Sequence, residues 1–127
     1  MNNIKIINFE NVSFAEKETF SIRNSVRAVI FDDENNIGIM KIKGGVFYKV
    51  PGGGIEKGES REDALKRECM EEAGVNIEII AKLGKVIEVK KVHKKVQNSY
   101  CYIAKVIGKK GSQSLTESEV RDGYEVE

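Results

Sequence analysis

The feature that most constrains this chain is a run of glycines followed closely by a helix pattern that carries three glutamates. The run PGGG occupies residues 51–54, and the segment REDALKRECMEEA occupies residues 61–73. Ser60 is a good N-cap with Asp63 placed to close a capping box, and Gly74 suits a left-handed C-terminal cap. The sequence therefore predicts a helix over residues 61–73 that begins just after a glycine-rich loop.

The three glutamates of this helix, Glu68, Glu71 and Glu72, fall close together on a helical wheel. Like charges at this spacing repel by roughly 0.2–0.5 kcal/mol per pair, so a counter-charge is expected beside them. The apolar residues expected to pack on a sheet fall on the neighbouring side of the wheel: Leu65, Cys69, Met70 and Ala73. The carboxylates are therefore predicted at the edge between the packed face and solvent.

A divalent cation would supply the missing counter-charge. Magnesium takes oxygen ligands and is usually shared between a few carboxylates and the phosphates of a substrate. The competing interpretation is plain solvated charge, because glutamate is a strong helix former and pairs of glutamates are common on helix surfaces. The residues by themselves leave both interpretations open.

The composition limits the classes of function. With 127 residues, 40% of them hydrophobic and 32% charged, residues 1–127 are expected to form one soluble globular domain. The 21 basic and 20 acidic residues nearly cancel, so no overall field attracts nucleic acid or an anionic membrane. Any site for an anion must be local.

The cysteines and the N-terminus indicate a cytoplasmic location. Cys69 and Cys101 lack metal-ligand spacing, and Cys69 lies within the helix pattern, where a small buried residue is expected. Nothing at the N-terminus resembles a secretion signal, and no apolar run approaches membrane-spanning length. We therefore expect reduced thiols and no membrane partner.

Several β-branched, partly alternating runs predict strands around this helix. Residues 21–33 and 37–43 are predicted to pair as a hairpin, because the polar cluster DDENN separates them. The opening residues 3–14 are predicted to be a further strand or an irregular arm. The other predicted strands are 45–50, 75–92, 95–108 and 123–127. The sequence thus predicts a mixed sheet with one well-marked helix.

The spacing within the glycine and glutamate segment is specific. Gly53 is followed after five residues by Glu59 and, after seven more, by RECMEEAGV over residues 67–75. Each fixed position matches the Nudix box, including its apolar positions. The chain therefore resembles the Nudix hydrolases, and most closely their small MutT-type members.

This resemblance implies a fold, a reaction and a set of site residues. The fold would be an α/β/α sandwich around a mixed sheet, and the reaction would be hydrolysis of a nucleoside diphosphate linked to another group, with Mg²⁺ or Mn²⁺. The metal ligands would be Glu68, Glu71, Glu72 and the Gly53 main-chain carbonyl. Arg67 would orient a carboxylate, and Glu59 would brace the loop. A non-catalytic Nudix-fold module that binds a nucleotide is the alternative, although the intact box favours an enzyme.

Other residues are weaker candidates for substrate binding. Lys41 and Lys43 alternate on a strand, where one could meet a phosphate, or both could form a solvated strand face. Tyr48 or Phe47 could stack on a base, or could belong to the core. The lysine-rich run VKKVHKKVQ is more typical of protection against edge pairing than of RNA binding.

The catalytic base and the end of the chain remain open questions at this point. Glu68 is one candidate base, and the polar segment KKGSQSLTESEV offers Glu117 and Glu119, since relatives often recruit a further glutamate from a late loop. Family members usually continue past the last strand into a second helix, which GYEVE lacks. We therefore expect a truncated chain, or an apolar face covered by the N-terminal arm or by a second copy in a homodimer.

Overall fold

The computed structural model describes residues 1–42, 47–108 and 125–126. Its helices and strands are, in chain order, β1 (Asn3–Ile7), α1 (Phe14–Lys17), β2 (Ser21–Phe31), β3 (Met40–Ile42), β4 (Phe47–Lys49), β5 (Gly52–Gly54), α2 (Arg61–Ala73), β6 (Asn76–Lys90), β7 (Lys95–Ile107) and β8 (Glu125–Val126).

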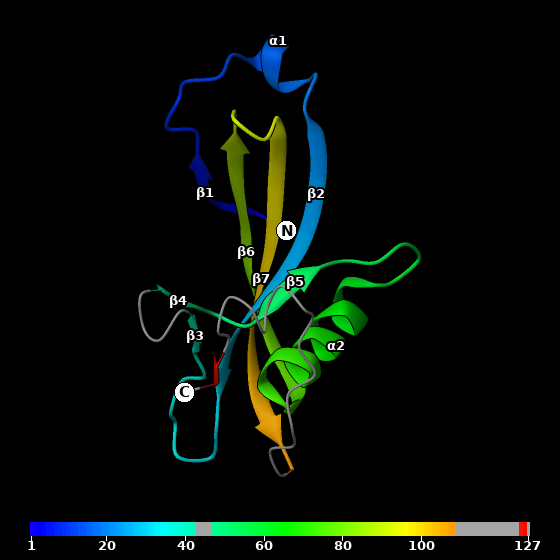
Figure 1. Cartoon of the computed structure of the whole chain (residues 1–127). Helices are drawn as coiled ribbons and strands as arrows, with labels where there is room; N and C mark the ends of the chain where they lie inside the picture. The colour runs from blue at the N-terminus through cyan, green and yellow to red at the C-terminus, as the bar shows by residue number, and fades with distance from the viewer. Residues whose placement is uncertain (43–46, 109–124, 127) are drawn as a thin grey trace.

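The main sheet is mixed and has the strand order β1-β6-β7-β2-β5. Strands β6 and β7 form a long antiparallel hairpin, whereas β2 pairs in parallel with β7 and β1 pairs in parallel with β6. In Figure 1, β2, β6 and β7 run side by side, with α1 at one end and α2 beside the other half. The predicted α/β class and mixed sheet are confirmed, and residues 3–7 form a strand.

The hairpin predicted between residues 21–33 and 37–43 is wrong. Strand β7 occupies one edge of β2 along its full length, and β5 occupies the other edge at Ser25, Val26 and Arg27. Past the turn, one isolated bridge joins Phe31 to Ile37, and the Gly38 N–H donates to the Ile30 carbonyl at 2.9 Å. Strand β3 instead belongs to a second sheet of order β4-β3-β8, because β4 and β8 occupy its two edges.

Helix α2 spans the predicted residues Arg61–Ala73. The Ser60 hydroxyl accepts a hydrogen bond from the Asp63 N–H at 3.1 Å, and Gly74 ends the helix in the left-handed conformation with φ 68°. Local capping signals therefore fix both ends of this helix.

The buried face of α2 is rotated from the predicted one. The expected packing of Leu65, Cys69 and Ala73 is confirmed, but Met70 is 36% exposed and Ala64 packs in the core instead. These side chains meet β2 and β7 in the larger core cluster, which also includes Val26, Ala28, Ile30, Tyr102 and Ala104. The rotation also buries Glu68 and Glu72, which were predicted at the solvent edge.

In the described parts of the chain, no helix is both long and apolar enough to span a bilayer.

Candidate active site

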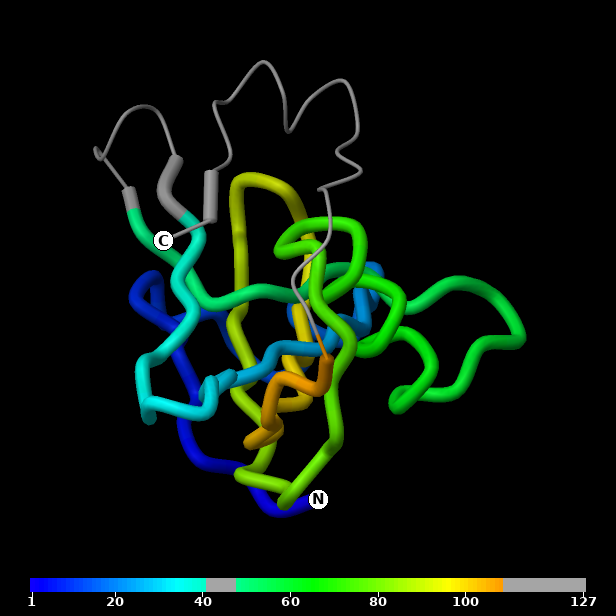
Figure 2. The backbone as a smooth tube through the Cα atoms, turned by 90° about the horizontal axis from the view of Figure 1, so that it is seen from below, coloured from blue at the N-terminus to red at the C-terminus, as the bar shows by residue number. Residues whose placement is uncertain are grey.

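The glycine run lies along the edge of the main sheet as β5. Gly52, Gly53 and Gly54 pair antiparallel with Arg27, Val26 and Ser25 of β2. Gly52 has φ 150°, and a Cβ at this position would collide with the carbonyl oxygen of Val26. Glycine is therefore required here by both conformation and space. From β5 the chain continues into a wide loop on the outside of the molecule and then enters α2 (Figures 1 and 2).

Gly53 makes room for a carboxylate. A Cβ built on Gly53 would lie 2.6 Å from the carboxylate carbon and from both carboxylate oxygens of Glu68. The Glu68 carboxylate therefore packs directly against the main chain of β5. This contact joins the two halves of the motif, the glycine run and the glutamate helix.

Arg67 is the centre of a network of carboxylates. Its guanidinium binds Glu59 through two hydrogen bonds, Nε to Oε2 at 2.8 Å and Nη2 to Oε1 at 2.9 Å. Its Nη1 donates to Glu68 at 2.9 Å and to Glu71 at 3.2 Å. Nη2 also donates to the Gly54 carbonyl at 3.0 Å, which fixes the loop to the helix. Arg67 thus supplies a counter-charge to Glu68 and Glu71, two of the three helix glutamates.

The same network shifts the acidity of its members. The hydrogen bond from Arg67 lowers the pKa of the Glu59 carboxyl below its usual value of 4.5, and burial opposes part of this effect. The hydrogen bond to Glu59 in turn raises the pKa of Arg67. The Glu59–Arg67 pair is therefore charged at every pH at which the protein is expected to work.

The stability of the protein should depend on this pair in acid. Because the pKa of Glu59 is lower in the folded chain than in the unfolded chain, its contribution is complete above about pH 5 and disappears as the pH falls through 4.5 and below. The free energy of unfolding can be measured by urea denaturation in EDTA. Between about pH 5 and 3 we expect it to fall less steeply in Glu59→Gln than in the wild type.

A matched control for this measurement is Glu88→Gln. Glu88 lies 3.9 Å from Lys90 at the limit of an ion pair, and it is distant in sequence from the network. Its removal should leave the acid slope as in the wild type. A Glu59→Gln slope equal to that of the wild type would contradict the proposed coupling between Glu59 and Arg67.

Glu72 is placed differently from Glu68 and Glu71. Its side chain is fully buried, Oε1 accepts the Gly52 N–H at 2.9 Å, and Oε2 lies 3.3 Å from Lys49 Nζ. The prediction of a solvent-facing Glu72 is therefore wrong, because the buried arc of α2 runs from Ala64 to Ala73 and includes this position.

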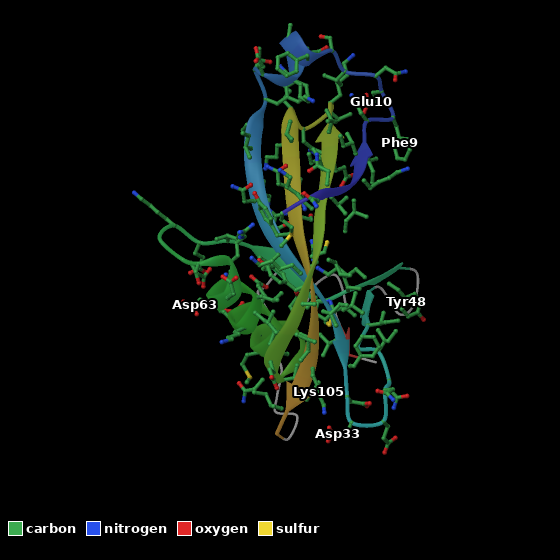
Figure 3. All side chains as sticks on the ribbon, turned by 180° about the vertical axis from the view of Figure 1, so that it is seen from behind. Phe9, Glu10, Asp33, Tyr48, Asp63 and Lys105 are labelled. Atoms are coloured by element: carbon green, nitrogen blue, oxygen red, sulfur yellow. The ribbon has the colours of Figure 1, made fainter. Side chains whose placement is uncertain are left out.

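Lys49 is a site residue that the sequence interpretation missed. It lies on β4 next to Tyr48, and successive side chains of a strand point to opposite faces. Tyr48 is 56% exposed and lies at the outer edge of the molecule (Figure 3), whereas Lys49 reaches the buried Glu72. The signal that could have identified it was the alternation of Tyr48 and Lys49, two residues before the proline that opens the glycine run.

The remaining candidates are only partly described. Lys41 lies in β3, paired with Tyr48 of β4. Lys43, Glu117 and Glu119 lie outside the described residues. Neither cysteine belongs to the network: Cys69 is buried, which raises the pKa of its thiol to about 12, and burial also raises the pKa of Cys101.

The donor chemistry of this site fits a hard cation, although the described side chains are not gathered around a single point. Glu68 and Glu71 share Arg67 Nη1, and Glu68 packs on Gly53, so two carboxylates lie together against the main chain of β5. Glu72 faces Gly52 and Lys49 instead. Among the described residues, no three acidic, histidine or cysteine side chains form a ready group for a metal in these conformations.

Comparison with known proteins supports the resemblance. The NUDIX domain matches residues 21–125. A protein of Bacillus subtilis (strain 168) named "Putative 8-oxo-dGTP diphosphatase" is 36% identical over 56 residues, which are 44% of this chain and 38% of that relative. The chain therefore matches less than half the length of this curated relative.

Solved structures share the fold. The MutT protein of Methanosarcina mazei Go1 has a TM-score of 0.61 at 20% identity and covers 78% of this chain and 75% of its own. The MutT NUDIX hydrolase of Burkholderia pseudomallei has a TM-score of 0.64 at 23% identity, with 75% of each chain covered. The NUDIX hydrolase of Nitrosomonas europaea has a TM-score of 0.63 at 22% identity and covers 82% of this chain and 72% of its own.

The domain match spans most of the chain, and the segment from Gly53 to Val75 carries each fixed position of the motif. On these grounds the chain belongs to the Nudix family.

Proposed function

We propose that this protein hydrolyses the diphosphate bond of a nucleoside diphosphate linked to another group. The observation that carries the proposal is the packing of the Glu68 carboxylate on Gly53, held by an arginine that also binds Glu59 and Glu71. An arrangement with three carboxylates on one arginine costs repulsion that a purely structural helix would avoid. A cation that binds these carboxylates together with a polyphosphate would offset this repulsion.

A divalent cation, Mg²⁺ or Mn²⁺, would be held by Glu68, Glu71, Glu72 and the Gly53 carbonyl. Bound there, it would acidify a water molecule and neutralise phosphate oxygens. Nudix hydrolases generally use divalent metals, and oxygen donors of this kind suit both ions.

The described residues would prepare this site in three ways. Arg67 orients the carboxylates of Glu68 and Glu71, while Glu59 fixes Arg67 through two hydrogen bonds. The Gly52 N–H fixes Glu72. Lys49 carries a positive charge close to this group, where it could meet a phosphate oxygen of the substrate.

The proton of the attacking water needs a carboxylate base. Glu68 is one candidate, and Glu117 and Glu119 of the later segment are the others. Single changes to glutamine, compared by kcat at saturating substrate, distinguish them, because loss of the base lowers kcat with little change in KM.

Three further residues are candidates for contacts with the substrate. We propose Lys41 and Lys43 for phosphate contacts and the exposed Tyr48 for stacking on a base. The curated relative is named for 8-oxo-dGTP, and one solved structure that shares the fold is of a UDP-X diphosphatase. A panel of nucleoside triphosphates, oxidised nucleoside triphosphates, nucleotide sugars and ADP-ribose, assayed with Mg²⁺ or Mn²⁺ for released phosphate or nucleotide, tests the proposal.

A nucleotide-binding module without turnover is the second candidate function. It predicts that one of these compounds binds and that no product is released.

The proposed homodimer also stays a prediction. Exposed aromatic residues near the N-terminus, Phe9 at 90% and Phe14 at 72%, are compatible with a covered surface there, and Phe9 lies at the outer edge of the molecule in Figure 3.

Cation binding should stabilise the fold independently of turnover. Millimolar Mg²⁺ or Mn²⁺ is expected to raise the melting temperature, because the ion binds the native carboxylates and relieves their repulsion. The shift should be reduced in Glu71→Gln. It should persist in Asp63→Asn, which removes an exposed carboxylate from the same helix. Equal melting temperatures of the wild type with and without either ion would argue against a cation site.

A further inference from the structure

A second feature lies beside the candidate active site. A cavity of about 560 Å³ is bounded by the start of β2, the loop after β5 and the start of β7. Arg23, Asn24, Gly54, Glu56 and Lys95 contribute to its walls. Gly54 also accepts the hydrogen bond from Arg67, so this cavity and the carboxylate network meet at the end of β5.

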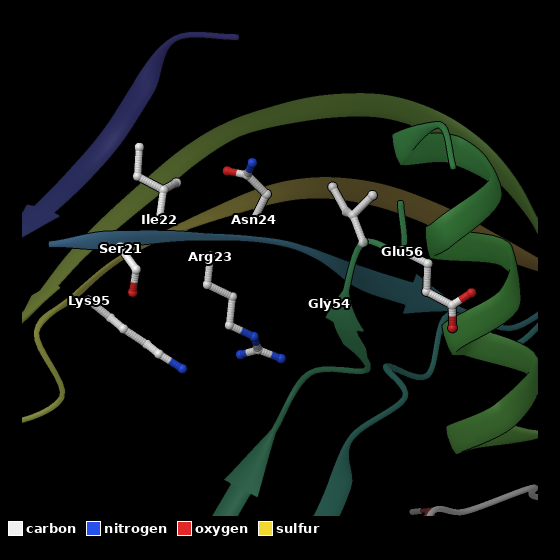
Figure 4. Close-up of a pocket in the computed structure, with 8 residues that line it drawn as sticks. Ser21, Ile22, Arg23, Asn24, Gly54, Glu56 and Lys95 are labelled. Atoms are coloured by element: carbon white, nitrogen blue, oxygen red, sulfur yellow. The ribbon is translucent and has the colours of Figure 1, made fainter. Parts of the chain in front are cut away.

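Arg23 is held in place within this cavity. Its side chain extends from β2 toward Gly54, and Nη2 lies 3.4 Å from the position that a Cβ would take on Gly54 (Figure 4). Its Nη1 donates to Gln97 Oε1 at 3.3 Å, and the buried Gln97 donates in turn to the Ser25 hydroxyl at 3.3 Å. A buried polar network therefore orients the Nη1 edge of the Arg23 guanidinium, and the Nη2 and Nε donors face Gly54.

The cavity carries positive charge that the described residues do not neutralise. In the described ranges Arg23 forms no ion pair, and the same is true of Lys95, whose side chain lies on the same side of β2 (Figure 4). Lys90 lies behind this wall, where its Nζ shares the Gln97 oxygen at 3.0 Å and pairs with Glu88 at 3.9 Å. Glu56 is the acidic residue of the wall, and it lies 3.7 Å from Arg67.

We propose that this cavity binds an anionic group of the substrate, a phosphate attached to the diphosphate that is cleaved. An arginine with free donors binds phosphate through two parallel hydrogen bonds, and lysine adds a point charge. The preferred substrates would then be nucleotides with a third phosphate, rather than nucleotides whose second group is a neutral sugar. This inference rests on the proposed function for the chemistry, but the anion site can be measured without turnover.

The first test is binding of inorganic pyrophosphate in EDTA, followed by NMR titration of the backbone amides. The Gly54 and Arg23 amides should shift on titration. Arg23→Gln should weaken binding about tenfold, which is the scale of one charge-assisted hydrogen bond. Lys95→Gln, which removes a cation of the same cavity, should weaken binding in the same direction.

Lys105→Gln is the matched control, because Lys105 is a half-exposed lysine that lies 3.6 Å from Asp33 and pairs with Phe31, at the opposite end of β2 from this cavity. It should leave pyrophosphate affinity unchanged. Wild-type affinity in both Arg23→Gln and Lys95→Gln, or an equal loss in Lys105→Gln, would overturn the proposal.

The second test separates the cavity from the catalytic network. With a nucleoside triphosphate, Arg23→Gln should raise KM about tenfold and leave kcat within about twofold, whereas KM for a nucleotide sugar should stay unchanged. Equal effects on both substrates would overturn the assignment. If no compound is hydrolysed, the proposed function fails, and the pyrophosphate titration still decides whether the anion site exists.

Discussion

Replacing Glu71 by glutamine is expected to lower kcat by about a hundredfold or more while the fold survives. Glutamine keeps the size of the side chain but removes the negative charge that a cation would require. The Glu71 side chain is 34% exposed, and its described contact is a 3.2 Å hydrogen bond from Arg67, which also holds Glu59 and Glu68. The change should therefore move the melting temperature by only about 2 °C.

Asp63→Asn is the control for this experiment, because it removes one negative charge from an exposed position of the same helix. Its kcat should be that of the wild type. Near-normal turnover of Glu71→Gln with saturating Mg²⁺ would remove Glu71 from the proposed metal ligands.

Glu72→Gln is expected to affect stability as well as turnover, whereas Glu71→Gln should affect mainly turnover. Glu72 is fully buried, accepts the Gly52 N–H at 2.9 Å and pairs with Lys49 at 3.3 Å. Removing its charge leaves Lys49 without this ion pair inside a partly buried site, so a loss of stability of about 1–3 kcal/mol accompanies the loss of turnover. Among the helix carboxylates, Glu71 is therefore the cleaner catalytic test.

The sequence predicted those parts of the molecule that local signals determine. Helix α2 has the predicted ends because Ser60 and Gly74 act within one turn of it. The hairpin of β6 and β7 was also expected, since its two strands are adjacent in the chain. The association of Gly53, Glu59, Arg67 and the glutamates followed from one motif of 23 residues, whose members the structure brings into contact.

Features that depend on distant pairing were not predictable in this way. Strand β3 leaves β2 after one bridge because β4 and β8, the latter from the end of the sequence, occupy its two edges. The contact of Arg23 with Gln97 spans 74 positions in the sequence. The burial of Glu72 was missed because a helical wheel treats glutamate as polar, whereas the Gly52 N–H and Lys49 compensate this carboxylate within the packed face.

The contact between Gly53 and Glu68 gives the second large effect. Gly53→Ala would place a methyl group 2.6 Å from the Glu68 carboxylate. Because the carboxylate is the far end of a flexible side chain, it should move away rather than disrupt β5. Loss of a positioned ligand or base of this kind is expected to lower kcat about a hundredfold, with only a small change in melting temperature. Gly38→Ala is the control, since a Cβ there would meet Ile30 at an ordinary 3.8 Å.

A double-mutant cycle determines whether the effect passes through Glu68. If Gly53→Ala acts by displacing this carboxylate, then Gly53→Ala combined with Glu68→Gln should be about as slow as Glu68→Gln alone, because the same interaction cannot be lost twice. Two independent hundredfold losses would instead multiply. Multiplication would mean that Gly53 contributes by another route, such as its main-chain carbonyl, and that its contact with Glu68 is only a consequence of close packing.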